Sequence, residues 1–529
     1  MSVYDVVVKR LSEIKGFKPE KRPVLEEALD KVLSSTRSPF LVIQAPTGYG
    51  KTTLSLSLAL HSLKDSSLFD RVIHVLPMRS IIEDIDRTAK EAFGFSRTKM
   101  MGSSEEFLHL FPLNITTVDT FTWDILKLNT KKITQVERGR EFGYDYLTQA
   151  SILTSLVIFD EAHFILEEPR MKTAFLAVLR FLMENNVPII IMTATLSRGY
   201  FELFKKYAQN NGYYFEPEPL VPDENDPFIK RESKKNFEIQ FKTGNPLDFI
   251  DSAKRNAIIV NSVKRAVEIF DQAKEDAPKL GFEEEEIMLI HGRMKPSHKA
   301  RLIEKLREWK NKESFLIIGT QAVEAGVDFS VDVMITDAAP INSLIQRFGR
   351  VARYDEKNAE IIIIEDAPVH PYDGKKVERT IALMKESSTL NPRIPQTYQG
   401  IVDEIHGKTK TKVMSGVDRS RERKLRVLLK DPTKRSVDVL SEIKSMIKEE
   451  GPLLRDFLIP LEVDDEYVLV SPEKMLELAK RGLLQVRVGE NEISVDSEAI
   501  AYKIAERIAL GEKIVVKFTG KYDEERGIV

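Results

Sequence analysis

The stretch FLVIQAPTGYGKT, residues 40–52, decides the fold of this chain. Its first half is an apolar run that predicts a buried strand, and glycines and a lysine follow directly. Gly48 and Gly50 let the backbone approach a phosphate without a Cβ clash. Lys51 would bridge phosphates, and the Thr52 hydroxyl would ligate Mg²⁺. This order of strand, glycine-rich loop and helix predicts a phosphate-binding loop in an α/β sheet.

A second apolar run, SLVIFDEAH at residues 155–163, ends in two acids. Asp160 would hold Mg²⁺, and Glu161 would orient and deprotonate an attacking water. The alternative is a helix start with acids near its dipole, but the strand-like run directly upstream argues against it. His163 is either a plain buried histidine or a relay to the strand end TAT, residues 193–195. Together the two motifs predict hydrolysis of a nucleoside triphosphate.

Short apolar runs recur in two series along the chain, at residues 38–200 and 256–366, with amphipathic stretches between them. This alternation predicts an α/β protein with two tandem domains, whose parallel sheets carry functional loops at the carboxyl ends of their strands. The predicted parts are a first domain at residues 1–215, a linker at 216–236, a second domain at 237–370, and a smaller helical and mixed accessory region at 371–529.

Composition excludes several classes of protein. The chain has 529 residues, a net charge of −3 and no cysteine, so disulfides, cysteine-ligated zinc and iron–sulfur clusters are excluded. The amino terminus lacks the apolar core of a signal peptide, and no apolar run approaches the about 20 residues that span a membrane. We expect a cytoplasmic protein. Residues 408–435 hold 11 lysines and arginines against 3 acids, which indicates either a solvated surface or a nucleic-acid contact.

The second domain carries two further motifs, GTQAVEAGVDFS at residues 319–330 and LIQRFGRVAR at residues 344–353. The spacing of Arg347, Arg350 and Arg353 predicts three guanidiniums on one helical face. Arginine beside a γ-phosphate stabilises the charge of the transition state. We therefore expect this domain to supply arginine fingers to a nucleotide held by the first domain, the alternative being a basic surface helix.

Eight motifs stand in the order found in superfamily 2 helicases, over about residues 20–360: APTGYGKT, LPMRSI, TVDT, DEAH, TAT, IVNSVKRA, GTQAVEAGVD and QRFGRVAR. The phrase DAAPINSLIQRFGR resembles, more narrowly, the helicase portion of the CRISPR-associated helicase–nuclease of type I systems. The resemblance implies two RecA-like domains and an ATP-driven motor on single-stranded DNA. It also implies recruitment to an R-loop by a crRNA-guided surveillance complex. The lack of a membrane-spanning run, in turn, predicts no membrane partner.

The resemblance also assigns roles to residues. It implies that ATP and Mg²⁺ are bound and ATP is hydrolysed by Gly48, Tyr49, Gly50, Lys51, Thr52, Thr53, Asp160, Glu161, Asp328, Gln346, Arg350 and Arg353, with Mg²⁺ on Thr52 and Asp160. The DNA backbone would be followed by Arg79, Thr120, Ser262, Lys264 and Thr320. Coupling between the acids and the TAT strand end would involve His163, Thr193 and Thr195. Pro77, Arg79 and Thr120 are expected to face outward on one edge of the sheet.

Two departures from the family pattern qualify this reading. Family members carry an amino-terminal HD nuclease domain, whereas this chain begins almost at the helicase and its 8 histidines include no His-Asp dipeptide. We therefore expect a split form with a separate HD nuclease subunit. The glutamine that reads adenine is not obvious, and Leu25 stands near its place. The alternatives are an RNA or DNA-repair helicase of the same superfamily, or an ATP-gated nucleic-acid-binding scaffold for a nuclease.

Overall fold

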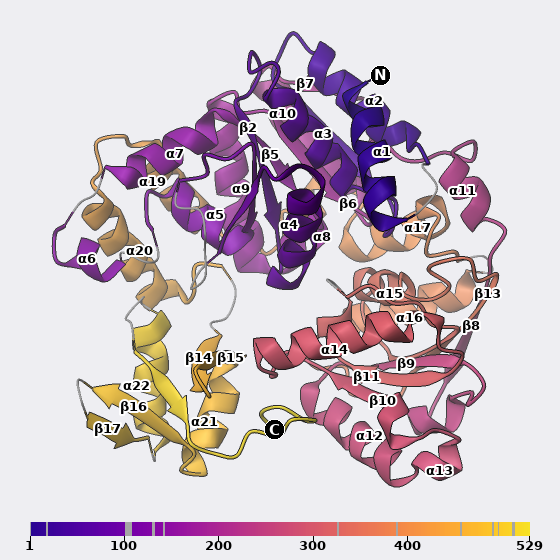
Figure 1. Ribbon diagram of the computed structural model, residues 1–529. Coiled ribbons are helices and arrows are strands. Elements are labelled where there is room, and N and C mark those ends of the chain that lie inside the picture. The colour runs from indigo at the N-terminus through magenta and orange to yellow at the C-terminus, as the bar shows by residue number, and fades with distance from the viewer. Residues whose placement is uncertain are drawn as a thin grey trace. The chain divides into compact units, whose positions relative to one another are not determined.

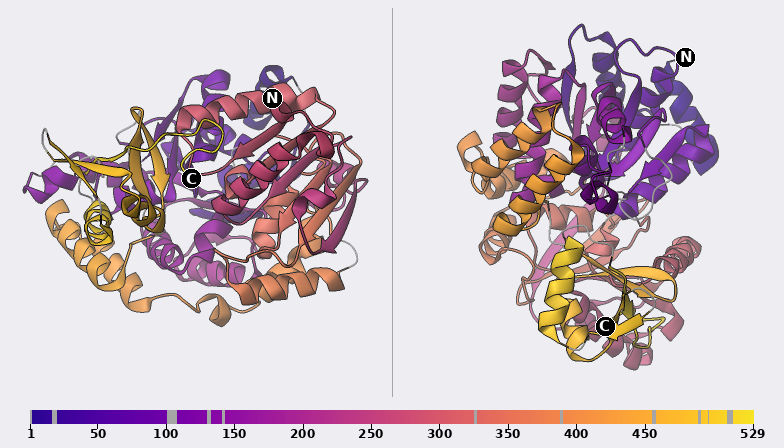
Figure 2. Two further views of the ribbon diagram at one scale, coloured as in Figure 1. Left: turned by 90° about the horizontal axis from the view of Figure 1, so that it is seen from below. Right: turned by 90° about the vertical axis from the view of Figure 1, so that its left-hand side faces the viewer.

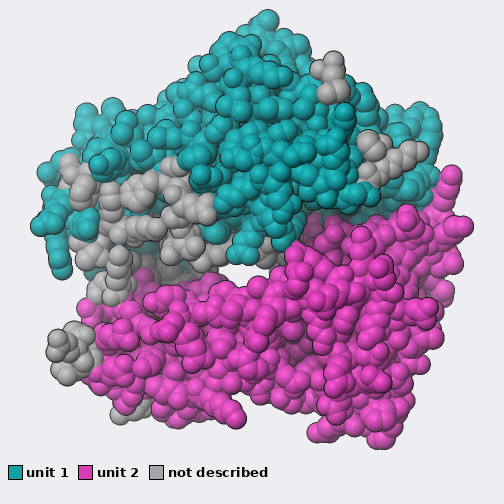
Figure 3. All heavy atoms as spheres, in the orientation of Figure 1, with its two compact units in different colours: residues 1–233, 391–455 teal, residues 234–390, 456–529 magenta. Residues whose placement is uncertain are grey.

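The structure is a computed structural model (Figure 1). It describes residues 2–16, 20–100, 108–129, 133–140, 143–324, 327–387, 390–454, 458–488, 491–495, 497–509 and 514–529. The chain forms two compact units, coloured teal and magenta in Figure 3. Unit 1 contains Met1–Ser233 and Asn391–Arg455, and unit 2 contains Lys234–Leu390 and Asp456–Val529. Residues 371–529, which the sequence groups into one accessory region, are thus divided between the units.

Unit 1 is built on a seven-stranded parallel sheet with the order β3-β4-β2-β5-β6-β1-β7. Its strands are β1 (Pro39–Gln44), β2 (Arg71–Leu76), β3 (Ser96–Lys99), β4 (Leu113–Thr117), β5 (Ser155–Phe159), β6 (Ile189–Thr193) and β7 (Tyr214–Phe215). Five of these coincide with the apolar runs of the first series, which confirms the predicted α/β class. All parallel strands end at one edge, so the phosphate-binding loop, the DEAH acids and the TAT residues converge there.

Helices cover both faces of this sheet (Figure 1). Apolar side chains of the first four helices pack with β1, β2, β4, β5 and β6 in one core. On the other face, Phe159 of β5 contacts Phe121 and Phe175 edge-on. The helices are α1 (Val3–Lys15), α2 (Pro23–Ser34), α3 (Thr52–Ser62), α4 (Arg79–Phe93), α5 (Val118–Ile125), α6 (Ile133–Glu137), α7 (Tyr144–Leu153), α8 (Ala162–Glu167), α9 (Pro169–Glu184), α10 (Arg198–Asn210) and α11 (Pro227–Glu232).

Four helices from later in the chain complete unit 1. They are α17 (Pro395–His406), α18 (Lys410–Val413), α19 (Arg419–Lys430) and α20 (Ser436–Glu450). Helix α17 lies on the carboxyl edge of the sheet, because the Tyr398 hydroxyl donates to the carbonyl of Ala194, 3.1 Å away. Helix α19 is bound to α9 by an ion pair of 2.8 Å between Glu422 and Arg180. Segments more than 200 residues apart in sequence thus share one unit.

Unit 2 contains a six-stranded parallel sheet with the order β10-β11-β9-β12-β13-β8. Its strands are β8 (Asn236–Lys242), β9 (Arg255–Ile259), β10 (Ile287–Ile290), β11 (Phe315–Gly319), β12 (Val333–Asp337) and β13 (Asn358–Ile364). Its helices are α12 (Val263–Glu275), α13 (Ala277–Leu280), α14 (Pro296–Glu308), α15 (Ile341–Phe348) and α16 (Gly374–Glu386). The second predicted series accounts for β9 to β13, so the tandem parallel sheets are confirmed.

A third sheet, mixed and five-stranded, belongs to unit 2 and has the order β15-β14-β18-β16-β17. It consists of β14 (Ile459–Val463), β15 (Glu466–Val470), β16 (Leu484–Val488), β17 (Asn491–Ser494) and β18 (Val516–Phe518), with helices α21 (Pro472–Lys480) and α22 (Glu498–Ala509). Figure 2 shows this small module in yellow. It has a core of its own around Leu461, Val470 and Leu478. Across the described ranges, no helix is long and apolar enough to cross a membrane.

Three strands of the two parallel sheets were not predicted. Strand β3 is short and polar (SRTK), β7 has two residues, and β8 (NFEIQFK) has a half-buried face instead of a continuous apolar run. Helix α11 and the start of β8 lie inside the stretch interpreted as a linker. All three lie at the edges of their sheets, and none has the continuous apolar run that is typical of a strand buried on both faces.

Candidate nucleotide-binding site

The phosphate-binding loop joins β1 to α3 at the carboxyl edge of the first sheet. Its start is fixed by a backbone hydrogen bond of 3.0 Å from the Ala45 N–H to the Thr193 carbonyl. Gly48 and Gly50 have φ angles of +85° and +88°, where a side chain is strained. The loop ends at Thr52, the first residue of α3. The glycines that the motif requires therefore stand where the backbone needs them.

The Lys51 ammonium lies among the two acids of the DEAH motif. Its Nζ is 2.9 Å from Glu161 Oε1 and 3.9 Å from Asp160 Oδ1. Burial alone would lower the pKa of Lys51, but the charges of Glu161 and Asp160 outweigh it and raise the pKa overall. The lysine is thus fully charged and neutralised by acids of its own unit. A phosphate entering this loop would compete with Glu161 for the same ammonium.

Asp160 is held as an anion at the end of β5. Burial would raise its pKa, but the Lys51 charge and a hydrogen bond from His74 lower the pKa overall. His74 Nε2 lies 3.3 Å from Asp160 Oδ2, and the backbone N–H of Glu161 donates to Asp160 Oδ1 over 2.8 Å. The sequence analysis missed His74, although a histidine inside the apolar run RVIHVL was a visible signal. An ionised carboxylate is the state that a magnesium ligand requires.

Glu161 has an unusual backbone. Its φ of +49° lies in the left-handed region, which is uncommon for a residue with a side chain. Strained residues of this kind are held in place by their surroundings and cluster at functional sites. Here the conformation brings the Glu161 carboxylate to Lys51 on the neighbouring loop.

His163 connects the acids to the TAT strand end. Its Nδ1 lies 2.9 Å from Thr193 Oγ1, and that hydroxyl donates to the Thr195 carbonyl over 3.0 Å. A hydroxyl has one proton, and Thr193 donates it to the Thr195 carbonyl. Thr193 Oγ1 therefore accepts a hydrogen bond from His163, which places the imidazole proton on Nδ1. Burial lowers the pKa of His163 to about 3, with the Lys51 charge as a further cause. The predicted coupling residues therefore form a connected chain around a neutral imidazole.

The other predicted nucleotide-binding residues of this loop differ in whether their side chains are available to a nucleotide. Tyr49 is fully buried, and its hydroxyl donates to Asp226 Oδ2 over 2.5 Å, so only its backbone is available to a nucleotide. Thr52 and Thr53 occupy the first turn of α3, beside the loop. Leu25 is fully buried in the core of unit 1. It is therefore not placed to read a base.

Residues of α17 and of the segment before it contact the phosphate-binding loop and the TAT segment, and they were not predicted. The Arg393 guanidinium donates to the carbonyl of Thr47 over 3.0 Å. Gln399 accepts a hydrogen bond of 2.5 Å from Gln44, at the end of β1, and donates to the carbonyl of Leu196 over 2.9 Å. No motif marks these residues, because their role depends on contacts with positions about 200 or 350 residues earlier in the chain.

In unit 2, the expectation of three guanidiniums on one helical face is wrong. Helix α15 ends at Phe348, so only Arg347 belongs to it. After Phe348 the chain leaves the helix in a turn, and Val351 forms a bridge with Val331, which removes Arg350 and Arg353 from the helical spacing. The Arg347 guanidinium is fully buried.

Arg347 forms the centre of a polar network within unit 2. Its Nε donates to Glu324 Oε1 over 2.8 Å, and the other nitrogens donate to the Thr336 hydroxyl, the Asp337 carbonyl, Asn261 Oδ1 and the Tyr372 hydroxyl. Five bonds use all five donors of a guanidinium. Arg347 is thus a structural residue, joining three motifs of this unit.

The two other arginines have partners of different kinds. Arg350 donates to the Glu324 carbonyl over 2.5 Å and is buried, whereas Arg353 forms an ion pair of 2.8 Å with Asp328. The Asp328 side chain is 65% exposed, so this pair can open at little cost. Gln346 is buried on α15. The finger roles of these residues remain predictions.

The residues expected on the DNA path vary in exposure. Thr120 is buried, with its hydroxyl 2.9 Å from that of Thr117, and Pro77 is buried too, so the expectation that both face outward is wrong. Thr117 is the N-cap of α5, and capping draws both threonine hydroxyls inward. The side chain of Arg79 lies outside the described part of the structure.

The candidates in unit 2 lie at the carboxyl ends of two strands. Ser262 caps α12, Lys264 in its first turn has a side chain that is 84% exposed, and Thr320 after β11 is buried. Lys264 is therefore the best-placed of the three to meet a phosphate.

The basic stretch at residues 408–435 is largely neutralised inside unit 1. Lys430 pairs with Glu184 at 2.8 Å, Lys424 pairs with Glu450 at 2.8 Å, and Arg421 donates to the Gly451 carbonyl over 2.6 Å. These three side chains bind α19 to α9 and to the end of α20, a structural role that neither prediction for this stretch included.

Known proteins share both the motifs and the fold. Residues 22–203 match the DEAD/DEAH box helicase family, and residues 252–356 match the family CRISPR-associated nuclease/helicase Cas3, C-terminal. The CRISPR-associated helicase Cas3 of Thermoproteus tenax is 28% identical over 366 residues, which cover 65% of this chain and 59% of that protein. The CRISPR-associated nuclease/helicase Cas3 of Methanothermobacter thermautotrophicus is 26% identical over 378 residues, covering 65% and 43%.

Among solved structures, T. fusca Cas3 with AMPPNP superposes with a TM-score of 0.57 at 17% identity, over 81% of this chain and 57% of that chain. At this identity the likeness shows the fold. Fold and motifs together define a superfamily 2 helicase of the DEAD/DEAH-box class. Within that class the chain is a homologue of the Cas3 helicases. It spans about half the length of the curated relatives that it matches.

Proposed function

We propose that this chain is an ATP-driven translocase on single-stranded DNA that acts in type I CRISPR interference. The observation that carries the ATPase part is the contact of Lys51 with Glu161 beside an ionised Asp160, at the end of the glycine loop. In this proposal the γ-phosphate of ATP takes the place of the Glu161 carboxylate on Lys51, which frees Glu161 to activate water. The DNA part is supported by the Cas3 relatives.

The residues present suit Mg²⁺. The Thr52 hydroxyl and the Asp160 carboxylate are hard oxygen ligands, and Asp160 is ionised. The ion would neutralise charge on the β- and γ-phosphates. The chain itself contributes Lys51 to the phosphates, Glu161 to the attacking water, and the neutral His163 to report the state of the acids to Thr193.

Two arginines of unit 2 complete the proposed ATPase. Arg350 and Arg353 would stabilise the charge that develops on the γ-phosphate. The Asp328–Arg353 ion pair would exchange Asp328 for phosphate as ATP binds. Because Asp328 is exposed, its release costs little free energy.

We further propose that the nuclease which acts with this motor is a separate HD protein, and that a crRNA-guided surveillance complex delivers both. The T. tenax relative is named a helicase and the Methanothermobacter relative a nuclease/helicase, so both arrangements have a counterpart among these names. Co-purification of the chain with a candidate HD protein, with and without a surveillance complex, tests this part.

The experiment that tests the motor is ATP turnover without nucleic acid, with single-stranded DNA and with single-stranded RNA, at matched salt. We expect strong stimulation by DNA alone, which weakens as salt rises because the contacts are with the backbone. Stimulation mainly by RNA would favour an RNA helicase, and no stimulation by either would favour a nucleotide-gated scaffold.

A further inference from the structure

The chain passes between its two units three times, after Ser233, after Leu390 and after Arg455, and the first two passages concern us here. We call residues 226–235 the first crossover and residues 390–399 the second crossover. Side-chain hydrogen bonds hold both crossovers, and each of these bonds joins two residues of the same unit.

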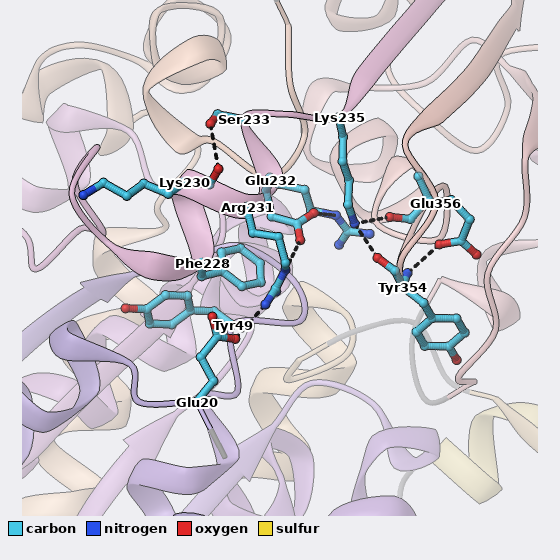
Figure 4. Close-up of polar contacts among 12 residues, drawn as sticks. Glu20, Tyr49, Phe228, Lys230, Arg231, Glu232, Ser233, Lys235, Tyr354 and Glu356 are labelled. Atoms are coloured by element: carbon cyan, nitrogen blue, oxygen red, sulfur yellow. Dashed lines mark hydrogen bonds and ion pairs between the residues drawn. The ribbon is translucent and has the colours of Figure 1, made fainter. Parts of the chain in front are cut away.

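The first residue of the first crossover, Asp226, is hydrogen-bonded to a residue of the phosphate-binding loop. Tyr49 donates its hydroxyl to Asp226 Oδ2 over 2.5 Å, and its ring meets Phe228 edge-on with the centroids 5.4 Å apart. The other oxygen of Asp226 accepts the Phe228 N–H over 2.8 Å, which caps α11. Asp226 is 3% exposed. One buried carboxylate thus joins the start of α11 to the glycine loop; Tyr49 and Phe228 are labelled in Figure 4.

The second crossover reaches the same loop. Arg393, 2% exposed, donates to the carbonyl of Thr47, two residues before Tyr49. Asn391 donates to the carbonyl of Glu232 over 3.1 Å, and Arg393 Nε is 3.9 Å from the Glu232 carboxylate. The two crossovers are therefore bound to each other as well as to the loop.

The far end of the first crossover holds residues 350–354 of unit 2, which we call the arginine loop. Lys235 Nζ donates to the carbonyls of Ala352 and Tyr354, each over 2.7 Å (Figure 4). These carbonyls flank Arg353. Ala352 has a φ of +44°, a left-handed conformation that needs support from its surroundings. A charged ammonium bonded to both carbonyls supplies that support.

We propose that the first crossover couples the phosphate-binding loop to the arginine loop, with Asp226 and Lys235 as positioning residues for the ATPase. Between them lie only helix α11, Ser233 and Lys234. A nucleotide that moves Tyr49 moves the bonded start of α11, and the short chain passes this displacement to the carbonyls around Arg353. The inference rests on the proposed function, because it assigns both loops to one reaction.

Lys235→Met tests the far end of this connection. The expected result is a fall in DNA-stimulated kcat of about ten- to a hundredfold, since a catalytic group misplaced by about 1 Å can lose about a hundredfold, with an unchanged Kd for a fluorescent ATP analogue. The matched control is Lys234→Met, since Lys234 is exposed one position earlier; it keeps both values. A Lys235→Met protein with wild-type kcat overturns the proposal.

An insertion of Gly-Gly between Ser233 and Lys234 tests the connection without touching its contacts. It leaves the bonds of Asp226 and Lys235 in place but makes the linking chain longer and more flexible. As for Lys235→Met, we expect a lower DNA-stimulated kcat and an unchanged Kd for the ATP analogue. The control is the same insertion after Ser66, in an exposed turn of unit 1. Wild-type kcat in the crossover insertion overturns the proposal.

Failure of the proposed function is distinguishable from failure of the coupling. A wild-type protein without DNA-stimulated turnover refutes the motor, and amide hydrogen exchange then decides the coupling. If ATP analogue slows exchange at residues 350–354 in the wild type and not in the crossover insertion, the coupling stands. Equal slowing in both proteins, or none in either, overturns it.

Discussion

The two parallel sheets place buried cations at their carboxyl edges in different surroundings. Lys51 of unit 1 has the DEAH carboxylates as its partners, which the phosphate of a nucleotide would replace in the proposed ATPase. Arg347 of unit 2 is bonded at all five N–H groups, partly to neutral oxygens that no ligand replaces. Both cations are buried and charged. The chemistry of the partners therefore distinguishes Lys51, the cation proposed to bind phosphate, from Arg347, a structural cation.

Lys51→Ala breaks the unit 1 side of this comparison and has the largest expected effect. Removing the ammonium takes away the phosphate contact, so we expect ATP turnover to fall by about 10³-fold or more. Steady-state turnover with single-stranded DNA measures it, with circular dichroism to confirm folding. Turnover at the wild-type rate would refute the assignment of this loop.

Arg347→Met breaks the unit 2 side. It leaves the Glu324 carboxylate buried without its partner, so we expect the free energy of unfolding to fall by about 3–5 kcal/mol. Denaturant unfolding measures the change. Arg353→Met is the matched control, because its partner Asp328 is exposed and the expected loss is about 0–1 kcal/mol. Equal losses in the two variants would contradict the distinction drawn between these arginines.

Sequence reasoning reached the α/β class, both sheets and the glycine loop because apolar runs and glycines are local signals. It placed Lys51, Asp160 and Glu161 together because parallel strands end at one edge. It misjudged Arg347, since spacing indicates a helical face but not where the helix ends or what the side chain meets. Arg393 escaped notice because its partner, Thr47, lies 346 residues away.

The neutral His163 predicts a pH dependence of stability. Its pKa is about 3 in the folded chain, against an ordinary value of 6.5. As pH falls from 6.5 towards 3, the unfolded chain takes up a proton that the folded chain refuses, so stability decreases by up to about 1.4 kcal/mol per pH unit. His163→Gln should lose this contribution. Unfolding curves measured across this pH range, with identical slopes for variant and wild type, would contradict a buried neutral imidazole.

His291 in unit 2 sharpens the comparison between the units. Burial lowers its pKa to about 4, and its Nε2 bonds the Arg526 carbonyl. As for His163, stability decreases as the pH falls below 6.5. The decrease due to His291 stops near pH 4, about one pH unit above the point at which the decrease due to His163 stops. His291→Gln should therefore flatten the same curve only down to about pH 4. If the wild type and His291→Gln continued to differ in slope below this pH, the pKa of His291 would not be higher than that of His163.

Lys264→Ala has the smallest expected effect. The side chain is exposed, so stability should change by less than about 0.5 kcal/mol. If Lys264 meets a phosphate, binding of single-stranded DNA should weaken a few-fold and the salt dependence of binding should become shallower. Fluorescence anisotropy over a salt series measures both. An unchanged salt slope would remove Lys264 from the proposed DNA path.

Displacement of a protein bound at the end of a single strand tests the central claim most directly. With ATP, the wild-type chain should strip the blocking protein from DNA, and Lys51→Ala should leave it in place at equal DNA occupancy. Hydrolysis of ATP on DNA without displacement would contradict the translocase. It would favour a nucleotide-gated scaffold.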